Sequence, residues 1–279
     1  LMDFESEFFA FPLSTHKDQV DSATQFLRWI HVKSIQLQAW GSGEQRQAVK
    51  HSETPTHVIK DDVGYGVFRL FPEQRWSRFS VIQPLYILPF SLLFQWGVAI
   101  QNLELGKVVY KRKTMDEFKQ EWKPVQKKIA KQLFKDYVFF PLIAGPSAIP
   151  VFTGNLVANG IRNIWTFSII FCGHFTKDAE VFPKTVLQDE SRGHWYMRQI
   201  RGSSNLTGSE AFHILTGHLS HQIEHHLYPD VPARRYRQMA PKVQAVCEKY
   251  GLNYNNASLV KQYGSVIKRI VKYAFPFKK

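Results

Sequence analysis

Cysteine is scarce in this chain. Its 279 residues include two cysteines, Cys172 and Cys247, and neither belongs to a C-x-x-C pair. Two cysteines are too few for a disulfide framework. The composition therefore predicts a protein of a reducing compartment.

Several catalytic and binding motifs are also missing. The H-E-x-x-H string of zinc proteases does not occur, and neither does the His-Pro-Gly-Gly string of a fused haem domain. The formal charge is +13, yet no zinc-finger, RNP or helix-turn-helix pattern accompanies it, which argues against a nucleic-acid partner. The excess of basic residues, which gives a pI of about 9.7, instead favours binding to anionic lipid headgroups or to phosphates.

Three stretches without charged side chains stand out. The mean hydropathy of the whole chain, -0.27, is too polar for a protein embedded mainly in lipid. Residues 81–100 are long enough to cross about 30 Å of hydrocarbon as one helix. Residues 137–161 contain prolines and glycines that would kink or interrupt a helix, and residues 163–176 cross only if joined to them. We expect membrane helices of modest extent; a buried soluble core is the alternative.

A strongly basic segment lies between the first two runs. Residues 107–135 contain ten lysines and arginines, an excess that is typical of a cytoplasmic loop. Apolar side chains recur there every three or four residues, which predicts an amphipathic helix on a membrane surface. These side chains are Phe118, Trp122, Val125, Ile129 and Leu133. A solvated charged linker is the alternative.

The densest chemical signal is the histidine-rich segment 217–229, which reads GHLSHQIEHHLYP. If the segment is helical, His221 and His225 are four residues apart, as are Gln222 and His226, and His218 lies two turns before His225. One helix would then present several nitrogens to one cavity. This predicts a site for iron, copper or zinc. A polar histidine-rich face without metal is the alternative.

The same segment resembles the third histidine box of the membrane fatty acid desaturases, in the branch that reads Q-I-E-H-H followed by an aromatic residue or leucine and then proline. The resemblance continues through residues 230–232, 235–236 and 241–252. Upstream it includes residues 61–66, 173–175, 195–196 and Gln199. We judge it to cover residues 58–275, the C-terminal part of a desaturase domain. Residues 1–57 form a separate segment of uncertain structure that does not resemble the family.

The resemblance implies an iron-dependent activity. Members of this family hold two irons, almost entirely through histidines from three boxes, and use dioxygen to remove two hydrogens from an unactivated acyl chain. The residues that match metal ligands are His174, His221, Gln222, His225 and His226. Gln222 stands where other desaturases have a histidine, and the adjacent His221 is the alternative third ligand. His174 is a ligand or supports one. Further histidines are expected to support the ligands or the fold, namely His194, His213 and His218.

Two of the three boxes are missing. The first, H-x-x-x-H or H-x-x-x-x-H, and the second, H-x-x-H-H, should precede Asp61, where the histidines are only His16, His31, His51 and His57. Pro55 separates the last two and breaks any helix that could align them. We therefore expect a chain that cannot assemble two irons and is inactive alone. The abrupt start of the resemblance near Thr56 predicts a frame error, a rearranged gene or a fragment.

The expected fold class is mainly α, an integral-membrane protein with a cytosolic helical cap that carries the histidine-rich metal site. In the cap, residues 233–250 read as a helix that ends at Gly251. Its basic residues either contact substrate phosphates or form a solvated face, namely Arg234, Arg235, Arg237 and Lys242. If each apolar run crosses once, the basic loop would put the third box outside. The third box can lie on the cytoplasmic side only if the apolar runs form helical hairpins that return to the same face, or if the positive-inside rule does not hold here.

The expected partners also follow from the resemblance. The substrate is an acyl-CoA or an acyl-lipid, and electrons come from a separate donor of the ferredoxin or rubredoxin type. A lipid bilayer is the third expected partner, and nucleic acid is not expected. Two other functions stay open, a histidine-box membrane hydroxylase and a non-catalytic membrane protein of desaturase ancestry.

Overall fold

A computed structural model describes residues 68–276 of the chain, apart from residues 73, 75, 102, 104–107, 109–112 and 183–189. The described residues are mainly helical, as predicted, and include a two-stranded sheet. They divide into two compact units. Ile169–Lys272 forms the histidine unit, and the hairpin unit lies within Asp62–Ser168 and Tyr273–Lys279. The separate segment predicted for residues 1–57 lies outside the described residues.

The first apolar run is bent rather than straight. The 3₁₀ helix η2 (Arg78–Ile82) leads into α4 (Gln83–Leu92), and α5 (Phe94–Gln101) follows after a bend of 98°. The prediction of one helix over residues 81–100 is therefore wrong. Leu93 leaves the helical region, with φ −104° and ψ 15°, and Asn163 Nδ2 donates to Leu92 O at 2.7 Å. A carbonyl that the break leaves unpaired is thus satisfied by a side chain of another helix.

The bend bears on membrane crossing. Among the residues that the structure describes, no helix taken singly has the length and apolar composition of a membrane span. Arg78–Leu92 and Phe94–Ile100 meet that criterion only together, as a bent pair.

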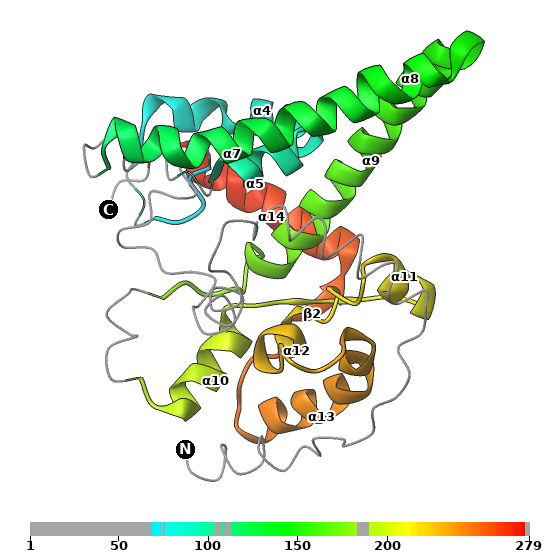
Figure 1. The fold of residues 1–279 in the computed structure, drawn as a ribbon. Helices are drawn as coiled ribbons and strands as arrows, with labels where there is room; N and C mark the ends of the chain where they lie inside the picture. Colours follow the sequence, from blue (N-terminus) through cyan, green and yellow to red (C-terminus); the bar gives the residue numbers. More distant parts are fainter. Residues whose placement is uncertain are drawn as a thin grey trace. The chain divides into compact units, whose positions relative to one another are not determined.

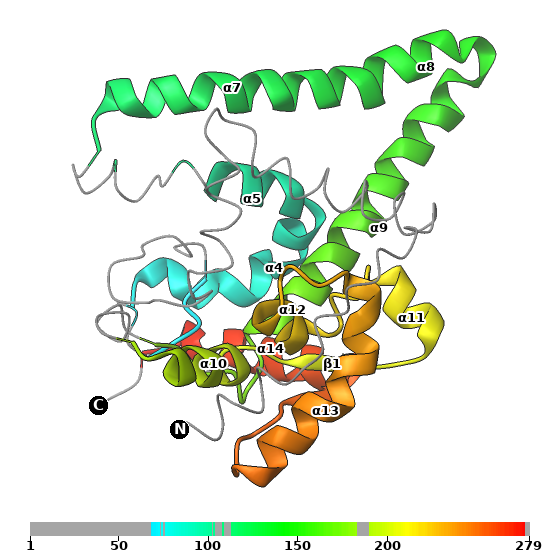
Figure 2. The same cartoon turned by 60° about the horizontal axis from the view of Figure 1, so that its bottom comes forward.

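Helices α7 (Met115–Phe134) and α9 (Ala148–His174) are the two arms of a hairpin (Figure 1). α7 begins at Thr114, which forms a capping box with Glu117. The arms are joined by a π-helical turn η3 (Lys135–Phe139), α8 (Phe140–Ile143) and the 3₁₀ turn η4 (Gly145–Ser147), also visible in Figure 2. The helix predicted within the basic segment is confirmed as α7, with its apolar residues Phe118 and Trp122 half-buried between exposed lysines; its place on a membrane surface stays a prediction.

The interruption predicted for residues 137–161 is confirmed at the tip of the hairpin. Gly145 has φ +56°, a left-handed conformation that favours glycine, and Pro146 follows it. Pro150 is tolerated because it falls in the first turn of α9, where backbone N–H groups have no partner inside the helix. α9 then runs on to His174, so the second and third apolar runs are joined in one helix.

The histidine unit is built from short elements. Its described helices are α10 (Arg192–Arg201), α11 (Glu210–Leu215), α12 (Gln222–Leu227), η6 (Ala233–Arg235), α13 (Tyr236–Lys249) and most of α14 (Leu259–Ala274). Strands β1 (Asn205–Thr207) and β2 (Asn256–Ser258) pair in parallel, with Asn205 opposite Asn256. This pairing ties the segment before α11 to the start of α14.

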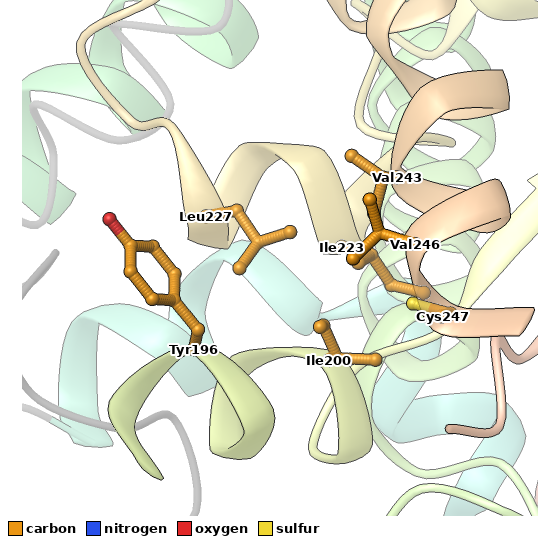
Figure 3. Close-up of a cluster of buried hydrophobic side chains, with 7 residues drawn as sticks. All are labelled: Tyr196, Ile200, Ile223, Leu227, Val243, Val246 and Cys247. Atoms are coloured by element: carbon orange, nitrogen blue, oxygen red, sulfur yellow. The ribbon is translucent and has the colours of Figure 1, made fainter. Parts of the chain in front are cut away.

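Apolar side chains of α10, α12 and α13 form a core in the histidine unit, as Figure 3 shows. Ile223 and Leu227 extend from α12 toward the other two helices. The cluster consists of Tyr196, Ile200, Ile223, Leu227, Val243, Val246 and Cys247. Because α12 has only six residues, it depends on such packing for its stability.

The end of α13 agrees with the sequence prediction. Gly251 has φ +66°, and its N–H donates to Glu248 O at 3.2 Å while Leu252 N–H donates to Cys247 O at 2.8 Å. These two bonds make a Schellman motif, which glycine favours. The helix predicted for residues 233–250 is confirmed, with η6 as its first turn.

Replacing Val243 by alanine should lower the free energy of unfolding by about 2 kcal/mol, because it removes two fully buried carbons and leaves a cavity. Val260→Ala is the matched control, since Val260 is 84% exposed, and should change stability by less than about 0.5 kcal/mol. Denaturant unfolding of the purified chain, followed by circular dichroism, measures both variants. Equal unfolding midpoints would contradict the place of Val243 in the core.

Candidate functional site

The turn between α11 and α12 sets where the histidine-bearing helix begins. Gly217 has φ +59° and His218 has φ +61°. His218 N–H donates to His213 O at 2.7 Å and Gly217 N–H donates to Ile214 O at 2.8 Å, which together close α11 with a Schellman motif. α12 starts only at Gln222. The prediction that His218 and His225 share one helical line is therefore wrong, because a left-handed turn separates them.

Three predicted site residues meet where the end of α9 approaches α12. Gln222 Nε2 lies 3.2 Å from His174 Nε2 and 2.9 Å from His226 Nε2. The centroids of the His174 and His226 rings are 5.2 Å apart. Both His174 and Gln222 are buried. We call these three residues the amide–histidine cluster.

The Gln222 amide can donate a hydrogen bond to each of the two imidazoles at the same time. Its NH₂ group carries two hydrogens, and a neutral imidazole nitrogen that accepts one of them must present a lone pair. With this assignment, His174 Nε2 and His226 Nε2 both direct a lone pair at the same amide. Transition metals bind through the same lone pairs, and the second atom of the amide, Oε1, is an oxygen donor. The cluster therefore contains two imidazole nitrogens that could bind a cation, and an amide oxygen that could join them if the amide turned its Nε2 away from the two rings.

His225 adjoins the cluster, with its ring centroid 5.4 Å from that of His226. Its Nδ1 lies 3.4 Å from the hydroxyl of Tyr236, which donates to Tyr228 O at 3.2 Å. Because a hydroxyl has one hydrogen, the proton between His225 and Tyr236 belongs to Nδ1. The lone pair of His225 is then on Nε2, the tautomer that a ligand bound through Nε2 requires.

His213, His218 and His221 make a second group. The His213 and His221 rings stack at 4.5 Å between centroids, and His213 Nδ1 lies 2.7 Å from Ser220 Oγ. Burial lowers the pKa of His221 to about 4, and His213 and His218 add to this shift. Burial also lowers the pKa values of His213 and His218, so all three are neutral at pH 7.

The two alternatives for the third ligand thus have different surroundings. Gln222 meets His174 and His226, whereas the ring of His221 packs on His213. Within the part of the chain that the structure describes, His221 Nε2 and His218 Nδ1 are buried without a hydrogen-bond partner. The role of His221 as a ligand stays a prediction.

α12 also carries a buried carboxylate. Glu224 is fully buried, and it accepts hydrogen bonds from Asn205 Nδ2 at 2.8 Å and from Tyr254 Oη at 2.7 Å. Burial raises the pKa of Glu224, and the bonds from Tyr254 and Asn205 oppose that shift. Because Glu224 lies two positions from both Gln222 and His226, it projects from the opposite side of the helix. Its anchoring therefore fixes the direction in which the two candidate ligands point.

These donors fit part of a metal site. Imidazole nitrogen and carboxamide oxygen suit iron, copper or zinc. In the described ranges, no three side chains of His, Cys, Asp or Glu converge closely enough to hold an ion by themselves. Within these ranges, His174, His226 and the amide of Gln222 are therefore a set of three candidate donors.

The remaining predicted residues lie elsewhere. His194 is exposed on α10 and contacts Ser191 Oγ at 3.1 Å. Arg237 forms an ion pair with Glu210 at 3.0 Å, with both side chains largely exposed. Arg234 and Arg235 are half-buried and Lys242 is exposed. Phosphate contact by these basic residues stays a prediction.

Of the residues that support the cluster, Asn205 and Tyr254 lie outside the motifs that the sequence shows. Asn205 lies in β1, Tyr254 in the segment before β2 and Tyr236 in α13, and they meet α12 only in the fold. Gly173 leaves room for Gln222, since an added Cβ would lie 3.1 Å from Gln222 Cγ. The one signal available beforehand is Glu224, a charged residue between apolar and histidine positions, which predicts a buried partner if the helix is covered.

Residues 25–258 match the family model described as fatty acid desaturase. The NADPH-dependent stearoyl-CoA 9-desaturase of Mycobacterium tuberculosis is 40% identical over 234 residues, which are 82% of this chain and 55% of that protein. The sn-1 linoleoyl-lipid 6-desaturase of Synechocystis sp. is 28% identical over 72% of this chain and 58% of its own length. The acyl-lipid (7-3)-desaturase of Rebecca salina is 27% identical over 76% of this chain and 48% of its own length.

The chain spans about half the length of these curated relatives. No solved structure matches it. The family match begins at residue 25, ahead of the motifs that start near residue 58, and the treatment of residues 1–57 as a separate segment stays a prediction.

Gly173→Ala tests the contact between α9 and Gln222. The new Cβ would lie 3.1 Å from Gln222 Cγ and 3.3 Å from Cδ, so the amide must move. Alanine favours a helix by up to about 1 kcal/mol over glycine, so stability should not fall. The affinity for Co(II), measured by absorption titration, should fall roughly 10-fold.

Gly154→Ala is the matched control, because it lies in the same helix with nothing within 4 Å of its new Cβ. It should gain stability and leave the Co(II) affinity unchanged. Equal affinities for the two variants would show that metal binding does not depend on the position of Gln222.

Proposed function

The chain belongs to the fatty acid desaturase family, and we propose that its histidine unit serves the dehydrogenation of a fatty acyl chain. The observation that carries this proposal is the meeting of His174, Gln222 and His226, which match ligand positions of the family, at 2.9 and 3.2 Å. The names of the stearoyl-CoA and acyl-lipid relatives support an acyl-CoA or an acyl-lipid as substrate.

The proposed reaction needs electrons as well as dioxygen. A CH₂–CH₂ unit loses two hydrogens and becomes CH=CH. Dioxygen takes up these hydrogens with two further electrons and two protons, and gives two molecules of water. Iron bound at the cluster would supply the activation of dioxygen. The chain's own contribution is a set of neutral donors at buried positions, His174 and Gln222, where water is excluded from the reacting carbons.

Tyr236 and Glu224 are the proposed orienting groups. Tyr236 selects the tautomer of His225 through Nδ1, and the anchored Glu224 directs Gln222 and His226 toward His174. Groups of this kind, which contact ligands rather than the metal, commonly change metal affinity when removed.

We further propose that this chain by itself holds at most one iron and does not desaturate. Residues 1–60 contain no H-x-x-x-H, H-x-x-x-x-H or H-x-x-H-H string, so this sequence does not supply the ligands of the other two boxes. The described donors fit a single ion. A single ion with three or four protein ligands lacks the second metal of the family's centre.

The hairpin unit supports a place in the lipid bilayer. Large apolar side chains at its tip are exposed, among them Leu142 at 71%, Ile143 at 66% and Ile149 at 76%. Exposed apolar groups clustered in this way favour transfer to lipid. The lysines of α7 suit the anionic headgroups of the cytoplasmic leaflet. On this proposal the protein is integral to the membrane and the metal site faces the cytoplasm.

A ferredoxin or rubredoxin-type protein is the proposed electron donor. The mycobacterial relative is named NADPH-dependent, which is consistent with NADPH as the source of electrons for such a donor. The net charge of +13 suits the docking of an acidic carrier.

Anaerobic loading with ferrous iron should give no more than one iron per chain, measured by elemental analysis after desalting. His226→Ala should lose most of this iron, because it removes one of the three donors. His194→Ala is the matched control, since His194 is an exposed histidine outside the cluster, and should keep the iron content of the unchanged chain.

The same loaded protein, given stearoyl-CoA, dioxygen, ferredoxin, ferredoxin reductase and NADPH, should form no unsaturated product detectable by mass spectrometry. Two irons per chain, or a double bond made by the chain alone, would overturn the proposal that it is incomplete. A product heavier by one oxygen would favour the hydroxylase alternative.

Membrane insertion predicts a specific effect at the tip of the hairpin. Leu142→Asp combined with Ile143→Asp should release a large share of the chain from membranes during an alkaline carbonate wash, because each charge is costly in hydrocarbon. Val260→Asp is the control, since Val260 is an apolar residue of the histidine unit that is still more exposed, at 84%, and it should leave retention unchanged. Full retention of the tip variant would contradict the proposed insertion of the tip.

A further inference from the structure

Side chains from two separate elements must meet for the amide–histidine cluster to form. His174 ends α9, whereas Gln222 lies 48 positions further on and begins α12. A helix of six residues has too few internal hydrogen bonds to hold its own geometry. Metal ligands must nevertheless be placed to within a few tenths of an ångström. Contacts outside α12 must therefore set its distance from α9.

Ser204 binds the end of α9. Its hydroxyl donates to Cys172 O at 2.6 Å, and its N–H donates to Gly173 O at 2.9 Å. Carbonyls in the last turn of a helix have no partner inside the helix, and these two bonds satisfy two of them. Ser204 is 1% exposed, so water cannot take its place. The two carbonyls directly before His174 are thereby fixed.

Asn205, the next residue, binds the start of α12. Its Oδ1 accepts from Ile223 N–H at 2.9 Å, and its Nδ2 donates to Glu224 Oε2 at 2.8 Å. The Ile223 N–H is one of the first-turn donors that a helix leaves unpaired. The bond to Glu224 holds the side of α12 opposite the candidate ligands. One side chain thus fixes both the position and the rotation of α12.

Ser204 and Asn205 are joined by a single peptide unit, whose Cα atoms are about 3.8 Å apart. We infer that this dipeptide, the Ser204–Asn205 clasp, is a positioning device for metal binding: it holds the end of α9 and the start of α12 at the separation at which His174 meets Gln222 and His226. The inference rests on the proposed function, because it assigns the clasp a role in holding the metal.

The clasp is itself secured by the strand pair and by buried side chains. Asn205 N–H donates to Asn255 O at 2.8 Å, and β1 pairs with β2. Ser204 Oγ lies 2.9 Å from Thr176 Oγ1, which accepts from Asn255 Nδ2 at 3.0 Å. Tyr254 Oη accepts from Asn205 Nδ2 at 2.6 Å. A buried polar network of this kind resists displacement, since moving one member leaves others unpaired.

Co(II) is the probe, because nitrogen and oxygen donors bind it and its visible absorption reports the number and geometry of its ligands. Ser204→Ala and Asn205→Ala should each weaken Co(II) binding roughly 10-fold or more and change the absorption spectrum. Asn256→Ala is the matched control, because Asn256 lies opposite Asn205 in the strand pair and is exposed. It should keep the affinity and the spectrum of the unchanged chain.

A swap of functional groups separates positioning from a general loss of folding. Asn205→Asp places two carboxylates against each other and should weaken Co(II) binding. Adding Glu224→Gln restores a carboxylate–amide pair with the donor reversed, and most of the affinity and the original spectrum should return. Circular dichroism and thermal unfolding identify which variants are folded.

The outcomes distinguish the clasp from the site that it serves. If His226→Ala binds Co(II) as tightly as the unchanged chain, the metal site is wrong and the clasp with it. If His226→Ala loses binding while folded Asn205→Ala and Asn205→Asp keep the original affinity and spectrum, the site stands and the clasp is wrong. Loss in Asn205→Asp with recovery in the swapped pair supports the clasp, even if an alanine variant fails to fold.

Discussion

The shortness of α12 is the constraint on which the candidate site depends. Its six residues cannot maintain a helix alone, so each side of it must be held by other elements. Ile223 and Leu227 pack against α10 and α13, Glu224 binds Asn205 and Tyr254, and Gln222 meets two imidazoles. Because these three sides belong to the same turn and a half of helix, the apolar core, the buried carboxylate and the candidate ligands are coupled.

The sequence predicted features that depend on a few neighbouring residues. The stop of α13 at Gly251 and the interruption at Gly145 both follow from a glycine in the left-handed region, and the basic helix α7 follows from its apolar period and its capping residue Thr114. The Q-I-E-H-H string indicated the family and placed Gln222 and His226 among the candidate ligands. Each of these features is determined by residues that lie within a few positions of one another in the sequence.

The features that could not be predicted depend on residues far apart. The bend after α4 is accompanied by a bond from Asn163, 71 positions away, and the anchor of Glu224 lies 19 positions before it. Spacing alone left Gln222 and His221 as equal candidates. Which of them meets His174 depends on where α12 begins, and that point is set by the Schellman turn at Gly217 and His218.

The parallel pairing of β1 with β2 also imposes an order on the formation of the site. During synthesis, His174, Gln222 and His226 leave the ribosome before Asn255 and the strand Asn256–Ser258 that secure β1. The imidazoles are therefore present in the nascent chain before the geometry that brings them together. The residues that secure the cluster are thus the last of its network to be synthesised, so the cluster can form only once the chain has been made as far as β2.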